Sequence, residues 1–249
     1  MSIELWWNSP KHIYIRVDEQ WWQPWVNTIA YYPLETDYND HSWNHRDPIQ
    51  IWSSVSLTTS SDGYKCANFI KDANSYINYG NQWNSIDVYQ TWCTIAFWLW
   101  DVVSNTISWI ASNGIIQWDN WTYGFKIFVW ARENQTNTWC IWVSDDIVWI
   151  GAISNTNLYW VNSMHMYTFT LTSLWSYALY KDKNTTPIWT ATATPNQRNR
   201  FSQCYLWYDT YDSDLVRHLV WNMRQVILEN KVWTQDDINK CYDTFVGIS

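Results

Sequence analysis

Glycine is scarce in this chain. The sequence has 6 glycines among 249 residues, whereas average usage of roughly 7% would give about 17. Glycine adopts positive φ angles at no steric cost, so a protein with many tight turns is usually rich in it. The scarcity therefore conflicts with a turn-rich fold unless another residue occupies the glycine positions.

Basic residues are also few. The chain has 15 Lys and Arg against 23 Asp and Glu, which gives a formal net charge of -8. Nucleic acids and anionic membrane surfaces are bound through an excess of Lys and Arg, so we expect neither as a partner. The chain also has no run of about 18 apolar, uncharged residues, the length that a helix needs to cross a bilayer. We therefore expect no membrane insertion.

Cysteine is present, but not in a pattern that forms a site. The five residues are widely separated, odd in number and include no C-x-x-C pair. This spacing predicts reduced, mostly buried thiols, and it argues against a disulfide framework or a cysteine-based metal site. The five are Cys66, Cys93, Cys140, Cys204 and Cys241.

Apolar residues alternate with a period of two through most of the chain. In CTIAFWL (93–99) the odd positions form one apolar row, and in HMYTFTLT (165–172) a row with Tyr167 and Phe169 lies opposite a row of threonines. Many short runs of this kind, separated by Asn, Asp, Ser and Thr, predict an antiparallel sandwich or barrel. The other runs are TISWIAS from 106, GFKIFVW from 124, CIWVS from 140, SYALY from 176, PIWTATAT from 187, QCYLWYD from 203 and MRQVILE from 223.

One helix is predicted, close to the C-terminus. In WTQDDINKCY (233–242), Thr234 can act as N-cap and Asp237 as its N3 partner, which is a capping-box arrangement. Ile238, Cys241 and Tyr242 then fall on one side at helical spacing. At the other end of the chain, residues 1–26 look like a separate short strand, HIYIRVD, followed by a linker around Gln23-Pro24.

Four segments carry a family resemblance: NTIAYYPLETDYNDHSWN (27–44), TIAFWLWD (94–101), NSMHMYTFTLTSLWSYALYKDKN (162–184) and the stretch from YLWYD to NKCY (205–242). In their order and spacing they resemble the LamG-like domains of the concanavalin A-like lectin/glucanase superfamily. The resemblance implies an all-β fold, an antiparallel jelly-roll β-sandwich over residues 27–246 with one short C-terminal helix. It also implies non-catalytic recognition of carbohydrate or of a cell surface.

The chain departs from the family pattern in one repeated way. Where the pattern has glycine, this sequence has tryptophan at Trp43, Trp207 and Trp221, whereas Trp98 and Trp233 fit positions where the family has or tolerates tryptophan. UGA is read as Trp under one variant genetic code and as Gly under another, used by some bacterial lineages and their viruses. We hypothesise that many of the 24 Trp positions are UGA codons that the native host reads as Gly, which would raise glycine to roughly a tenth of the chain.

The alternative is a genuine Trp-rich surface, because aromatic platforms stack on sugars and other flat ligands. We favour recoding, because binding platforms cluster on one face and these tryptophans follow the turns. In NDHSWNHRDP (39–48), for example, Trp43 stands among turn formers. If such turns need positive φ, a bulky residue there is strained.

No motif for catalysis is present. A glycan hydrolase needs two carboxylates about 5 Å apart across the scissile bond, and the five glutamates, among them Glu133, form no such cluster. Glu35 and Asp37 share one face of an extended segment, but no second Glu follows. His165 begins an alternating strand on its apolar side and is expected to be a packing residue, and neither a G-x-S-x-G elbow nor a nucleotide-binding glycine loop occurs. We expect no catalytic residue and no required cofactor.

Acidic loops offer the only candidate metal ligands. Asp37 and Asp40 lie near His41 and His45, and Asp145-Asp146 stand in VSDDIV. Loops of this kind can gather oxygen ligands for Ca²⁺, but Asp and Asn populate turns more often than calcium sites. The acidic residues in YDTYDSD (208–214) are likewise either calcium ligands or turn residues.

The expected partner is a glycan or another cell-surface ligand, bound on the extracellular surface or by a virion protein of the tail or fibre type. The N-terminal sequence lacks the basic start and apolar core of a secretory signal. The chain is thus expected to be part of a virion assembled inside the cell, or a fragment of a larger surface protein. A purely structural module that packs against neighbours, as a homo-oligomer or in a larger assembly, is the second hypothesis.

Overall fold

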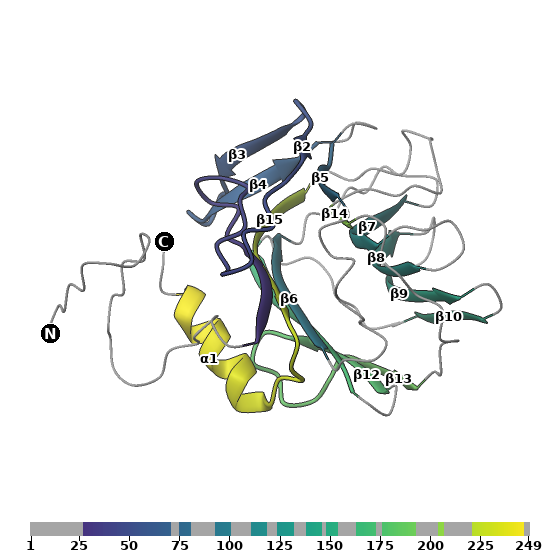
Figure 1. Cartoon of the computed structure of the whole chain (residues 1–249). Helices are drawn as coiled ribbons and strands as arrows, with labels where there is room; N and C mark the ends of the chain where they lie inside the picture. The colour runs from purple at the N-terminus through teal and green to yellow at the C-terminus, as the bar shows by residue number, and fades with distance from the viewer. Residues whose placement is uncertain are drawn as a thin grey trace, which may run out of the picture.

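The computed structural model describes residues 27–70, 75–80, 93–100, 111–118, 124–131, 138–145, 148–153, 163–172, 176–192, 204–206 and 221–246. These residues form two sheets whose strand pairs are all antiparallel. Figure 1 shows the two sheets and one helix at the C-terminal end of the chain. The prediction of an antiparallel β-sandwich with a short C-terminal helix is confirmed.

The larger sheet has eight strands in the order β13-β12-β11-β6-β15-β4-β3, with β1 paired to β15. Its strands are β1 (Thr28–Tyr32), β3 (Val55–Thr59), β4 (Lys65–Phe69), β6 (Cys93–Trp100), β11 (Met164–Leu171), β12 (Ser176–Lys181), β13 (Trp189–Thr192) and β15 (Trp221–Glu229). The central strands β6, β11 and β15 come from distant parts of the sequence. Long-range pairing therefore determines this sheet.

The second sheet has seven strands in the order β10-β9-β8-β7-β14-β5-β2. Its strands are β2 (Gln50–Ile51), β5 (Ile77–Gly80), β7 (Ala111–Trp118), β8 (Gly124–Ala131), β9 (Thr138–Asp145), β10 (Val148–Ile153) and β14 (Cys204–Leu206). The strands β7 to β10 form a simple meander, in which each strand pairs with the next one along the chain.

The predicted strands agree with the structure where it describes them. The alternating runs from 93, 124, 140, 165, 176, 187, 203 and 223 all contain strands, whereas the TISWI part (106–110) of the run from 106 lies outside the described residues. The last strand, β15, begins at Trp221, two residues before the run predicted from 223. The strand predicted in HIYIRVD also lies outside the described residues.

The helix α1 (Gln235–Val246) begins with the predicted capping box. The Asp237 backbone N–H donates to Thr234 Oγ1 at 3.2 Å, and the Thr234 N–H and hydroxyl both donate to Asp237 Oδ2 at 2.8 Å. This reciprocal pair satisfies backbone donors that a helix start would otherwise leave unpaired. With twelve residues, α1 is short, and no described helix is long and apolar enough to cross a membrane.

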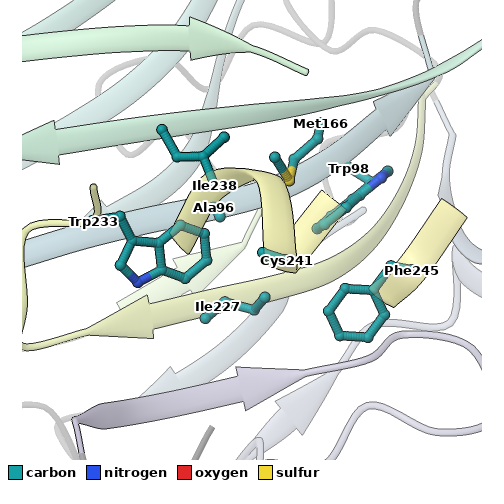
Figure 2. Packing of buried hydrophobic residues seen from close by; sticks show 8 residues of the cluster. All are labelled: Ala96, Trp98, Met166, Ile227, Trp233, Ile238, Cys241 and Phe245. Carbon is teal, nitrogen blue, oxygen red and sulfur yellow. The ribbon is translucent and has the colours of Figure 1, made fainter. Parts of the chain in front are cut away.

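The helix covers one face of the eight-stranded sheet. Its buried residues Ile238, Cys241 and Phe245 pack against residues of β6, β11 and β15, and Figure 2 shows this cluster from close by. Because the opposite face of the same strands packs in the core, every residue of β6 is buried. The sequence pattern predicted only one buried face for this strand, and the helix accounts for the other.

Replacing Asp237 with Asn should lower the free energy of unfolding by about 1 kcal/mol at neutral pH, because it removes the charge that strengthens the hydrogen bonds from Thr234 and the ion pair with Lys231. Burial acts to raise the pKa of Asp237, but hydrogen bonds from Lys231 and Thr234 outweigh it and lower this pKa below its ordinary value of 3.8. The ionised Asp237 side chain therefore stabilises the fold fully above that value, and its contribution is lost as the pH falls through the folded pKa.

Urea unfolding of the wild type and the Asp237→Asn variant checks this, at neutral pH and in strongly acidic buffer. The two proteins should differ at neutral pH and converge in acid. Asp236→Asn is the matched control, because Asp236 is exposed in the same helical turn. An equal loss of stability in both variants would contradict a specific cap.

Candidate functional site

The loop after β1 is held together by Asp40, one of the predicted metal candidates. This carboxylate is 2% exposed and accepts four hydrogen bonds. Oδ1 accepts from the backbone N–H groups of Tyr31 and Ser42 at 2.9 and 2.8 Å, and Oδ2 accepts from the Ser42 hydroxyl and the Arg46 N–H at 2.8 Å. Because both oxygens already face N–H and O–H donors, Asp40 organises the loop.

Asp37, another acidic candidate, makes contacts of its own. Asp37 accepts from the Asn39 N–H at 2.9 Å and lies 3.0 Å from His41 Nε2. Asp145 is the last residue of β9, and Asp146 lies outside the described residues. Within the part of the chain that the structure describes, no group of three or more His, Cys, Asp or Glu is placed to hold a metal ion. Calcium binding stays a prediction.

Trp43 lies in this loop with its side chain 55% exposed. Its φ angle is not positive. The non-glycine residues with positive φ in the described part of the chain are Leu34, His45, Asp182 and Gln225. The expectation of backbone strain at Trp43 is therefore wrong, because the turn places its left-handed residue at His45, with φ of 47°.

Glu35 is paired with a buried arginine. Arg224 of β15 is 0% exposed at its side chain, and its Nη2 lies 2.7 Å from Glu35 Oε1. The guanidinium also lies over the Tyr64 ring, 4.6 Å from its centroid, and Nη2 donates to the carbonyl of Phe245 at 3.4 Å. The last turn of α1 has no basic residue of its own, so Arg224 supplies the positive charge that favours a helix C-terminus.

Gln225 links Glu35 to Tyr31 through hydrogen bonds beside this ion pair. Gln225 donates through Nε2 to Glu35 Oε1 and accepts from the Tyr31 hydroxyl. Burial raises the pKa of Tyr31, and the Glu35 charge adds to this effect, so the phenol stays a neutral donor. Gln225 has positive φ where β15 bulges, and its N–H donates to the carbonyl of Pro33. The cluster fixes the chain after β1 against β15.

A Ser–His–Asp array lies where β11 begins. The Ser163 hydroxyl is 3.0 Å from His165 Nε2, and His165 Nδ1 is 2.8 Å from Asp182 Oδ2. This order of groups is the one that activates serine nucleophiles. However, Asp182 Oδ1 also accepts from the Met166 N–H at 3.0 Å, and the Asp182 N–H donates to the Met166 carbonyl. The array thus ties the turn after β12 to β11, as expected for a packing histidine.

Two groups of contacting polar side chains, one around Arg224 and one around His165, were not predicted from the sequence. The sequence separates Glu35 from Gln225 by 190 residues, and His165 from Asp182 by 17 residues. The one available signal for the second pair was the alternating hairpin pattern of 165–180, which brings the end of β12 beside the start of β11.

The described cysteines behave as predicted. Cys66, Cys93 and Cys241 are free and buried. Burial raises the pKa of the Cys66 thiol to about 11 and that of Cys93 to about 12. Burial also raises the pKa of the Cys241 thiol. Since the thiolate is the reactive form, burial disfavours reaction at all three thiols.

No family model matches the chain, and no curated protein matches it. Solved structures resemble it in fold. The receptor-binding domain of the botulinum neurotoxin C/D mosaic serotype superposes with a TM-score of 0.66 at 13% identity, and that of botulinum neurotoxin D with 0.64 at 15%. The binding domain of Paraclostridial Mosquitocidal Protein 1 gives 0.63 at 13%.

Each of these three alignments covers 88% of this chain and 52% of the solved chain. The chain therefore spans about half the length of its structural neighbours. At these identities the likeness establishes the fold alone, an antiparallel β-sandwich.

Proposed function

We propose that residues 27–246 form a non-catalytic recognition domain for a glycan or another cell-surface ligand. The observation that carries the proposal is the β-sandwich shared with binding domains of toxins, described as receptor-binding in two cases. The LamG-like motifs support a lectin-type ligand. We therefore also propose that the domain belongs with the LamG-like, concanavalin A-like domains.

The position of α1 restricts where a ligand can bind. The helix packs on the outer face of the eight-stranded sheet, over β6, β11 and β15, and Figure 1 shows it on the far side from β7 to β10. That part of the face is occupied by α1. The loops at the rim, including residues 33–49, and the seven-stranded sheet are the candidate binding surfaces.

A virion tail or fibre, or a larger surface protein, is the setting that we propose for this domain. Either setting would place the domain where it meets a host cell, and either accommodates assembly with further copies. Calcium, if it takes part, would be held by rim loops such as the one containing Asp37.

A glycan array tests the recognition role. We expect selective retention on a subset of sugars, and the free sugar should compete it away. Repeating the array with a chelator tests calcium separately, because retention lost on chelation and restored by Ca²⁺ would show that the ion is needed. Uniformly blank spots would contradict the lectin proposal and favour the assembly module.

The Ser163–His165–Asp182 array allows a direct check of the non-catalytic part of the proposal. A fluorophosphonate probe labels activated serines by forming a bond from the serine oxygen to phosphorus, with loss of the leaving group. We expect no labelling above that of a Ser163→Ala control. Labelling of Ser163 that depends on His165 would contradict a purely binding role.

A further inference from the structure

The strand β3 lies at one edge of the eight-stranded sheet. In the described part of the chain its one strand partner is β4, and the order of the sheet ends at β3. Figure 1 shows β3 beyond β4, at the margin of the sheet farthest from β12 and β13. An edge strand presents unpaired N–H and C=O groups and can pair with a strand of another chain, so proteins usually protect their edges.

The turn between β3 and β4 determines which backbone groups of β3 point outward. In this turn the Ser60 N–H donates to the Tyr64 carbonyl at 2.8 Å. Residues that bond the partner strand alternate in an antiparallel ladder, and the pairing of β3 with β4 has no bulge. Counted back from Ser60, every second residue bonds β4, and Leu57 and Thr59 do not. Their N–H and C=O groups therefore point away from β4, where they have no partner among the described residues.

This edge lacks the protection that edge strands usually have. Natural edge strands are very short, carry charged residues or proline, contain a bulge, or are covered by a loop. β3 has five residues in continuous register with β4, and the stretch VSLTTSS (55–61) contains neither a charged residue nor a proline. By contrast, β2 has two residues, and the loop after β1 bonds that strand, because the His41 N–H donates to the Tyr31 carbonyl. Of these three strands, β3 is the one that is open to another strand.

We propose that β3 pairs with β3 of a second copy of this chain, antiparallel and about a two-fold axis. With Leu57 opposite Thr59 of the partner subunit, and the reverse pair by symmetry, all the outward N–H and C=O groups of these residues are hydrogen-bonded. Thr58 then lies at the axis, opposite Thr58 of the partner subunit, and threonines are a favourable cross-strand pair. Because the strand is uncharged, it can pair with itself without like-charge contacts, although the chain has a net charge of -8. This inference goes beyond the recognition function, because the pairing needs no ligand.

The oligomeric state of the whole chain tests the pairing. Sedimentation equilibrium over a range of concentrations should show a dimer, with about twice the chain mass of 30.0 kDa. Amide hydrogen exchange at Leu57 and Thr59 should be slow in the dimer, because hydrogen-bonded amides are protected. A monomer at every concentration, or fast exchange of these two amides within a dimer, would overturn the proposal.

Charges placed at the two-fold axis test the arrangement itself. Thr58 is exposed, so Thr58→Lys and Thr58→Glu should both fold, which circular dichroism checks. Each variant alone puts like charges opposite one another and should have the mass of a single chain. An equimolar mixture of the two should dimerise again, because opposite charges then face each other. Thr190→Lys is the matched control, at an exposed threonine of β13 on the other edge of the same sheet, and it should leave the dimer intact.

Two results with these variants would contradict pairing through β3: a dimer formed by either Thr58 variant alone, or no dimer in their mixture. Loss of the dimer in Thr190→Lys would also contradict it, because the effect would then not depend on β3. The glycan array is independent of these measurements. A chain that stays monomeric and still binds a sugar would overturn the pairing and leave the recognition proposal in place.

Discussion

Replacing Glu35 with alanine is expected to lower the free energy of unfolding by about 3–5 kcal/mol, because it leaves the buried Arg224 charge without its carboxylate. Arg224 is fully buried and lies 2.7 Å from Glu35 Oε1. Its Nε and Nη1 atoms are buried with no hydrogen-bond partner among the described residues, and beside Glu35 the charge is met by the Phe245 carbonyl and the Tyr64 ring, which are both uncharged. The variant would also remove the acceptor of Gln225. Chemical denaturation of both proteins at neutral pH measures the difference.

Two further variants separate the ion pair from the loop around it. Asp37→Ala changes an acid in the same segment whose side chain is 39% exposed, and it should cost less than about 1 kcal/mol. The double variant Glu35→Leu with Arg224→Met replaces both charges with apolar groups and should recover most of the stability, as buried pairs often do. If the Glu35→Ala protein were as stable as the Asp37→Ala protein, the Glu35 carboxylate would not be needed to stabilise the buried charge of Arg224.

The strand pattern could be predicted because alternation is a local property. The runs at 93–99 and 165–172 have the period of a strand, and the structure pairs them directly, with Tyr167 opposite Phe97. The helix start could be predicted for the same reason, since the capping box spans only residues 234–237. Short strands such as β2, with two residues, have too few positions to show a period.

The clusters around Arg224 and His165 could not be predicted from local patterns. Arg224 pairs with Trp98 of β6, on the face that α1 covers, and a bulge follows it in this pairing. The end of α1 and the Tyr64 ring cover the charge, and no local pattern indicates either contact. The partner, Glu35, stands far away in the sequence beside the positive-φ residue Leu34. Only the folded chain brings these irregular positions together.

Position 43 shows the same difference between what local sequence predicts and what the folded chain determines. Turn composition around Trp43 suggested a residue that had to be glycine for conformational reasons, yet the positive φ lies at His45. What separates Trp43 from Trp98 and Trp233 is burial, which the sequence does not display. The family resemblance had divided these three tryptophans in the same way.

Trp98→Gly is therefore expected to be the most damaging of the tryptophan replacements. Removing a large buried aromatic side chain costs about 3–5 kcal/mol, and glycine within a strand adds about 0.5–1 kcal/mol. The lost ring contacts Phe245 of α1, so the helix should detach from the sheet before the sandwich unfolds. Loss of the helical signal in circular dichroism, followed during thermal unfolding, measures this.

Trp43→Gly is the matched control, with the same change of residue at an exposed position. Its effect on the free energy of unfolding should stay within about 0.5 kcal/mol, as for most surface substitutions. Removing an exposed indole should also reduce aggregation, since exposed apolar groups promote association. If both variants lost equal stability, the indole at position 43 would be a structural part of the fold.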